Sequence, residues 1–84
     1  MNVMFTPSAW EDYQFWQERD RKVARKLDKL IKEMRRTPYD GLGKPEPLRN
    51  NLSGCWSRRL SQEHRVVYRI LDGTLEIIQC RGHY

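Results

Sequence analysis

A penultimate histidine and a proline-flanked glutamate are the side chains of this chain best suited to acid–base chemistry. His83 precedes Tyr84, whose terminal carboxylate would favour a protonated imidazole, as a general acid near neutral pH requires. Glu46 lies between two prolines, in a stiff segment that can hold a carboxylate in place. From the residues alone, a solvated tail and a plain surface loop remain open as alternatives for these two segments.

Three arginines bracket the short turn at residues 60–64 and could bind an anion. Arginine suits phosphate because its planar guanidinium donates two parallel hydrogen bonds. Neighbouring residues of a strand point to opposite faces, so Arg58 and Arg59 cannot both share a face with Arg65. Arg59 is the candidate for that shared cluster, although the register across the turn stays open.

A glutamate, a histidine, arginines and a tyrosine together can cleave RNA without a metal. A base takes the proton from the ribose 2′-hydroxyl, an acid protonates the departing 5′ oxygen, and an arginine stabilises the charge that builds up on phosphorus. Because RNA supplies its own nucleophile, this chemistry requires no cofactor.

A zinc site is the competing use of the potential metal ligands. Cys55, Cys80, His64 and His83 could supply four ligands, but the chain lacks the close Cys-x-x-Cys and His-x3-5-His spacings of zinc sites. Free cysteines are usually small apolar fillers, so we expect both to lie buried in strands. The sequence therefore predicts no metal.

The elements that must position these residues follow from hydrophobic periodicity. A strand is expected at 2–6, and a first helix begins near Ser8, where Ser8 and Glu11 have the spacing of a capping box. Asp20 can cap a second helix that Pro38 ends. Residues 39–50 are expected to form an ordered loop.

After that loop the apolar period changes to two. This change predicts strands at 55–60, 65–71 and 74–80, and Asp72-Gly73 predicts a tight hairpin between the last two. One face of the middle strand packs, and the other presents arginine. The order is typical of an α+β domain with two helices on one sheet face, so function is expected on the opposite face.

Composition limits the chain to one small basic domain. Its 84 residues carry 16 Lys and Arg against 11 Asp and Glu, a net charge of +5, which suits a polyanionic partner. Residues 17–37 hold nine of the bases against four acids, so the excess begins on the second helix. Two cysteines and the lack of a long apolar stretch favour a soluble cytoplasmic protein without a membrane span.

Several separated motifs together resemble the YoeB toxins of the RelE/ParE superfamily. They are residues 35–38 (RRTP), 43–48 (GKPEPL), 51–59 (NLSGCWSRR), 63–68 (EHRVVY) and 80–84 (CRGHY). The resemblance covers residues 1–84 as a single domain. It implies a microbial-ribonuclease-like fold with a mainly antiparallel sheet, and a type II toxin that cuts mRNA in the ribosomal A site.

The resemblance also implies a role for each candidate residue. Glu46 corresponds to the general base, His83 to the general acid, Arg65 to the transition-state stabiliser and Tyr84 to the ring that orients a nucleotide. The implied substrate-binding residues are Arg59, Arg49 and Lys44. Arg49 stands where relatives usually carry lysine.

The implied partners are a YefM-like antitoxin, the small ribosomal subunit with its mRNA, operator DNA through the antitoxin complex, and a second copy of the chain. A non-catalytic function is the alternative, either gyrase inhibition as in ParE-like relatives or nucleic-acid binding. The ending His83-Tyr84 together with Glu46 favours the nuclease, since a gyrase-directed relative does not require them.

Overall fold

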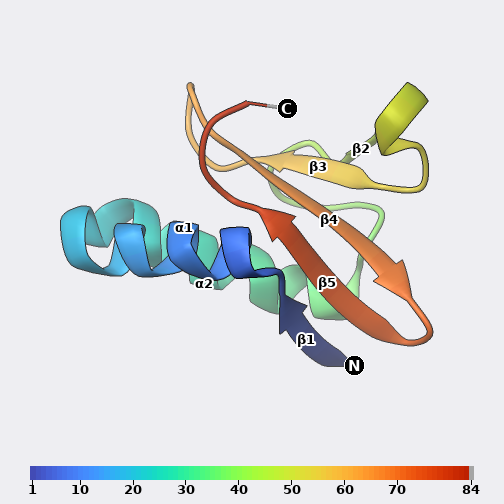
Figure 1. Cartoon of the computed structure of the whole chain (residues 1–84), viewed down its shortest axis with the longest axis horizontal. Helices are drawn as coiled ribbons and strands as arrows, with labels where there is room; N and C mark the ends of the chain where they lie inside the picture. Colours follow the sequence, from blue (N-terminus) through green and yellow to red (C-terminus); the bar gives the residue numbers. More distant parts are fainter. Residues whose placement is uncertain (84) are drawn as a thin grey trace.

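Two helices cover one face of a five-stranded sheet (Figure 1). The computed structural model describes residues 1–83. In chain order the elements are β1 (Asn2–Phe5), α1 (Pro7–Arg19), α2 (Arg21–Arg36), β2 (Glu46–Pro47), the 3-10 helix η1 (Asn50–Leu52), β3 (Trp56–Arg59), β4 (Arg65–Leu71) and β5 (Thr74–Gln79). The strand order is β1-β5-β4-β3-β2, with only β1 and β5 parallel. The predicted α+β fold is confirmed.

Helix α1 begins earlier than the sequence predicted, and a different residue caps it. Thr6 Oγ1 accepts a hydrogen bond from the Ala9 amide at 3.1 Å and donates one to the Ile78 carbonyl at 2.7 Å. Pro7 fits the first helical position because it has no N–H to satisfy and its φ is already helical. The predicted cap at Ser8 was therefore wrong, although the helix begins only one residue before it, and the true cap ties the helix to β5.

Helix α2 follows the prediction at both ends. Asp20 Oδ1 accepts from the Val23 amide at 3.2 Å, and the helix ends at Arg36, two residues before Pro38. Leu27 and Leu30 lie on its buried face. None of the helices within residues 1–83 combines the length and apolar character that crossing a membrane requires.

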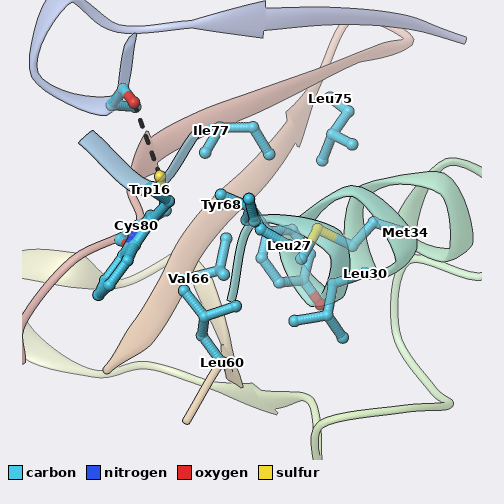
Figure 2. Packing of buried hydrophobic residues seen from close by; sticks show 12 residues of the cluster. Trp16, Leu27, Leu30, Met34, Leu60, Val66, Tyr68, Leu75, Ile77 and Cys80 are labelled. Atoms are coloured by element: carbon cyan, nitrogen blue, oxygen red, sulfur yellow. Dashed lines mark hydrogen bonds between the residues drawn. The ribbon is translucent and has the colours of Figure 1, made fainter. Parts of the chain in front are cut away.

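The main core lies between the helices and the sheet, and Figure 2 shows its packing. Tyr68 lies among the aliphatic side chains that α2 contributes, and Trp16 comes from α1. Cys80 packs here with its thiol 3.6 Å from the Ala9 carbonyl (Figure 2). Cys80 and Cys55 are both free and buried, as predicted, but neither lies in a strand: Cys55 precedes β3 and Cys80 follows β5.

The Cys80 thiol is expected to resist alkylation in the folded protein. Burial, with a smaller effect of the Asp12 carboxylate, raises its pKa to about 12 from the usual 9.0. The thiolate that reacts with iodoacetamide is then about a thousandfold rarer at pH 8 than in the unfolded chain. Mass spectrometry should find native Cys80 unlabelled and urea-unfolded Cys80 fully labelled. Equal labelling rates would contradict the burial.

A second apolar cluster covers the face of the sheet away from the helices. Leu48, Cys55 and Val67 form it, with Leu52 and Ile78 packed against them. The predicted arginine face of β4 is therefore also packed in part, since Val67 is 1% exposed. The segment predicted as a loop contains β2, which is the edge strand of the sheet. It leads into η1, which folds over this face.

Two local features of β4 and β5 set the path of the chain end. Asp72 and Gly73 both have positive φ, 50° and 75°, as the predicted two-residue hairpin requires. The β4–β5 register shifts between Val67 and Tyr68, so two residues of β5 oppose one step of β4. This bulge interrupts the alternation of faces just before the C-terminal tail.

A fully buried arginine holds residues 37–42 against the sheet. The Arg58 guanidinium pairs with Glu33 Oε1 at 2.7 Å and donates to the carbonyls of Thr37, Asp40 and Leu42. It also donates to the Tyr68 hydroxyl at 3.0 Å. The buried Arg58 side chain thus fixes the segment that leads to β2. Arg58 and Arg59 point to opposite faces, as predicted, since Arg59 is exposed.

Glu33 is expected to make stability depend on acid pH. The Leu42 amide, and after it Arg58, hold the pKa of Glu33 below its usual 4.5, against partial burial that raises it. The folded state thus binds this proton more weakly than the unfolded state, so the contribution is present above pH 4.5 and is lost as pH falls through the folded pKa. Urea unfolding should show Glu33→Gln destabilised at pH 7, with the gap to wild type closing in acid.

The matched control for this effect is Glu11→Gln, which changes an exposed carboxylate on α1. Its stability should follow that of the wild type at every pH. A gap for Glu33→Gln that stays constant from pH 7 into acid would contradict the assignment.

Candidate active site

The sheet face away from the helices collects the predicted site residues of the strands. Val66 and Tyr68 belong to the main core, so Arg65 must point to the other face. Arg59 pairs directly with Arg65 across β3 and β4, which settles the register that the sequence left open. Glu46 pairs with Ser57 and therefore lies on a third strand of the same face. Glu46, Arg59 and Arg65 thus lie on the face where the candidate residues were expected.

Glu46 and Arg65 face one another across β3. Arg65 Nη1 lies 3.7 Å from Glu46 Oε1, close enough for an ion pair but too long for a hydrogen bond. The Glu46 side chain is 56% exposed and that of Arg65 is 22% exposed. Arg65 Nη1 is itself buried and has no hydrogen-bond partner among residues 1–83. An open carboxylate therefore stands beside a half-buried guanidinium that retains a free N–H.

Ser57 is a polar residue of this face that the sequence reasoning missed. It is fully buried between Glu46 and Val67 in the strand register. Its hydroxyl has no hydrogen-bond partner within the described part of the chain. Only the pairing of β2 with β3 reveals its place beside Glu46, and no local signal in the sequence indicates that pairing.

The C-terminal tail is fixed to the domain, contrary to the alternative of a solvated end. The Cys80 amide donates to Asp12 Oδ2 at 3.0 Å, and Trp16 Nε1 donates to the Cys80 carbonyl at 2.8 Å. Further along, the Arg65 amide donates to the Gly82 carbonyl at 3.0 Å. The tail thus returns to the first residue of β4, as Figure 1 shows.

The same bonds hold the backbone of His83 near the first residue of β4, and its side chain is exposed. Its carbonyl accepts from Gln79 Nε2 at 3.2 Å, and its neighbour Gly82 is bonded to the Arg65 backbone. The structure therefore joins the segment of His83 to the strand that carries Arg65. Tyr84 lies outside the described residues.

The remaining predicted residues flank Glu46 along the chain. Lys44 precedes β2 with a φ of 51°, and Arg49 follows it as the residue before η1. Both side chains are exposed, as is that of Arg59. Unlike Glu46, Arg59 and Arg65, these two do not belong to paired strand positions. They add positive charge around a single carboxylate, which favours an anionic ligand.

Three of the four potential zinc ligands have other contacts. Cys80 and Cys55 lie in separate apolar clusters on opposite faces of the sheet. His64 bonds the backbone of the tail through Nδ1. Over residues 1–83, no three His, Cys, Asp or Glu side chains gather where they could hold a metal ion.

Comparison with known proteins shows the family. Residues 5–84 match the model of the YoeB-like toxin of bacterial type II toxin-antitoxin systems. The chain belongs to this toxin family. The Escherichia coli K12 toxin YoeB is 51% identical over 84 residues, which is the full length of both chains. This YoeB-like toxin therefore matches its curated relatives from end to end.

Solved structures of the family have the same fold. A YoeB/ParE toxin from Agrobacterium tumefaciens is 51% identical, with a TM-score of 0.97 and full coverage of both chains. YoeB in a YoeB–YefM complex from Staphylococcus aureus is 41% identical, with a TM-score of 0.92 over 100% of this chain and 98% of that one. A YoeB dimer from the same organism is 42% identical, with the same TM-score and coverage.

Proposed function

We propose that this YoeB-like toxin is an endoribonuclease that cuts mRNA in the ribosomal A site. The observation that carries the proposal is that Glu46 faces Arg65 on one side of the sheet, while the segment of His83 is bonded to the backbone of Arg65. A carboxylate, an imidazole and a guanidinium can supply the base, the acid and the charge stabilisation that transfer of a phosphoryl group to a ribose 2′-oxygen requires. Membership in a family of toxins agrees with an activity that harms the host cell.

In the proposed mechanism each group handles one proton or charge. Glu46 removes the proton of the ribose 2′-hydroxyl, and the 2′ oxygen attacks the adjacent phosphorus. The bond from phosphorus to the 5′ oxygen breaks, and His83 gives that oxygen its proton. Arg65 stabilises the extra negative charge on the phosphoryl oxygens. The products are a 2′,3′-cyclic phosphate and a free 5′-hydroxyl.

The other predicted residues contact the nucleotides on either side in this proposal. Arg59, Arg49 and Lys44 bind phosphates, and Tyr84 orients a base. RNA supplies the nucleophile, so no cofactor is required. The reaction takes place where ribosomes hold mRNA, which is the cytoplasm.

We expect the toxin to depend on the ribosome because its own site encloses little of an RNA substrate. Glu46 is more than half exposed, so the toxin alone provides few contacts to hold an mRNA strand in line for attack. Exposed bases cover α2, where they suit the phosphates of ribosomal RNA: Arg21, Lys22, Arg25, Lys26, Lys29, Lys32, Arg35 and Arg36. We infer that the ribosome supplies the missing positioning.

The family also supports two protein partners. Because a relative from Staphylococcus aureus occurs in a YoeB–YefM complex, we propose that a YefM-like antitoxin binds this toxin and that the complex represses its own operator DNA. A second relative is a YoeB dimer, which supports a homodimer here. The basic surface suits an acidic, partly disordered antitoxin segment that folds on binding.

Primer extension on a defined mRNA tests the proposal directly. Purified toxin added to a translating extract should create new 5′ ends inside the codon held in the A site. The same mRNA with its start codon removed should stay intact, because no ribosome presents it. Intact translated mRNA, with DNA gyrase supercoiling inhibited by the same protein, would overturn the proposal and favour a ParE-like activity.

A further inference from the structure

His64 makes a contact with the catalytic tail that the proposed mechanism does not yet use. Its Nδ1 accepts a hydrogen bond from the Gly82 amide at 2.8 Å. Its ring meets that of Trp16 edge to face, with the centroids 4.8 Å apart and the planes at 79°. The His64 carbonyl accepts from the Leu60 and Ser61 amides, so its backbone is also fixed. A half-buried imidazole thus presents an acceptor to the tail from a fixed position.

Gly82 is bonded on both sides by two consecutive residues. Its amide donates to His64 Nδ1, and its carbonyl accepts from the Arg65 amide at 3.0 Å. Its φ of 84° lies in the left-handed region, where the chain changes direction immediately before His83. Because both polar groups of Gly82 are held, the direction of the chain from Gly82 to His83 is held as well.

Arg65 and His64 are adjacent in the chain, so both hydrogen bonds to Gly82 come from the same short segment. Arg65 binds Gly82 through its backbone and faces Glu46 through its side chain. His64 and Arg65 together bond the tail that carries the proposed acid, and Arg65 is also the residue that stabilises charge in the proposed mechanism. A shift of about 1 Å between such groups can cost a hundredfold in rate.

We propose that His64 is a positioning residue for the general acid, acting through the bond from its Nδ1 to the Gly82 amide. This inference rests on the proposed function, because it assigns His83 the proton transfer. His64 itself does not touch the RNA in this proposal. Its acceptor atom aligns His83 with the phosphate that Arg65 holds.

Two substitutions separate the acceptor from the ring. Asparagine keeps an acceptor close to the position of Nδ1 but loses the ring, whereas phenylalanine keeps the ring and its contact with Trp16 but has no acceptor. In the ribosome assay, His64→Phe should lower kcat by about 10- to 100-fold with KM within about twofold of wild type. His64→Asn should retain most of the wild-type kcat.

Exchange of the Gly82 amide proton, followed by NMR, reports the bond independently of activity. It should be faster in His64→Phe than in wild type and remain slow in His64→Asn. The opposite order in both measurements, with phenylalanine tolerated and asparagine impaired, would show that the ring packs rather than positions, and would overturn the inference.

The wild-type protein in the same assay distinguishes the two proposals. If it cuts mRNA and His64→Phe cuts with an equal kcat, the role of His64 fails alone. If it leaves translated mRNA intact, the proposed function fails and the role of His64 fails with it. Thermal unfolding of both variants shows whether either result comes from a loss of fold.

Discussion

Replacing His83 with glutamine should lower the single-turnover rate of mRNA cleavage on the ribosome by about 10²- to 10⁴-fold, the range for loss of a general acid. Glutamine retains polar atoms at a similar reach, but its amide does not release a proton to the departing 5′ oxygen. The exposed side chain of His83 makes a loss of folding a minor factor. The fall should appear in kcat rather than KM, since the group acts in the transition state.

The controls for this result use the same ribosomes and mRNA. Glu11→Gln, an exposed change on α1, should cut at the wild-type rate. An mRNA with a 2′-deoxyribose at the cut position should resist both the wild type and Glu11→Gln, because it lacks the nucleophile. A His83→Gln protein with the kcat of wild type would remove His83 from the mechanism.

Arg58→Met should be the most destabilising single change to the fold, lowering the free energy of unfolding by about 3 kcal/mol or more. Methionine fills part of the volume but removes the donor that four acceptors at the edge of the core share: the Thr37, Asp40 and Leu42 carbonyls and the Glu33 carboxylate. For a domain of this size, such a loss is a large share of the total stability. Urea unfolding measures it directly.

Arg59→Met is a matched control because it changes the adjacent arginine, whose side chain is exposed on the opposite face of the sheet. Its unfolding free energy should stay within about 0.5 kcal/mol of wild type. Equal losses for the two variants would mean that the buried network around Arg58 contributes little. The comparison reports stability alone, since Arg59 is also a proposed phosphate ligand.

The sequence predicts those elements whose signals are local. Helix α2 and strand β4 carry clear apolar periods, and Asp72-Gly73 has the chemistry of its turn. The start of α1 was misplaced because Thr6 and Ser8 can both cap, and only the bonds from Thr6 to β5 distinguish them. Strand β2 was missed because two residues of Glu-Pro are too short for any period.

The sequence indicates which residues belong to the candidate site but not how they are arranged in space. The chemistry of Glu46, Arg65 and His83, and the resemblance to YoeB toxins, named the groups. Their proximity depends on pairing between distant segments, as does the buried position of Ser57. His64 carries no local mark of its role, because the bond that reveals it spans 18 residues of sequence.

The strand order has a consequence for the timing of synthesis. The first strand made, β1, pairs only with β5, the last (Figure 1). Until β5 has been made, β1 has no strand to pair with, and the tail that follows β5 has not yet bonded Arg65. The sheet is therefore completed only when its last strand has been made. The segment of His83 is thus the last part of the candidate site to take its place.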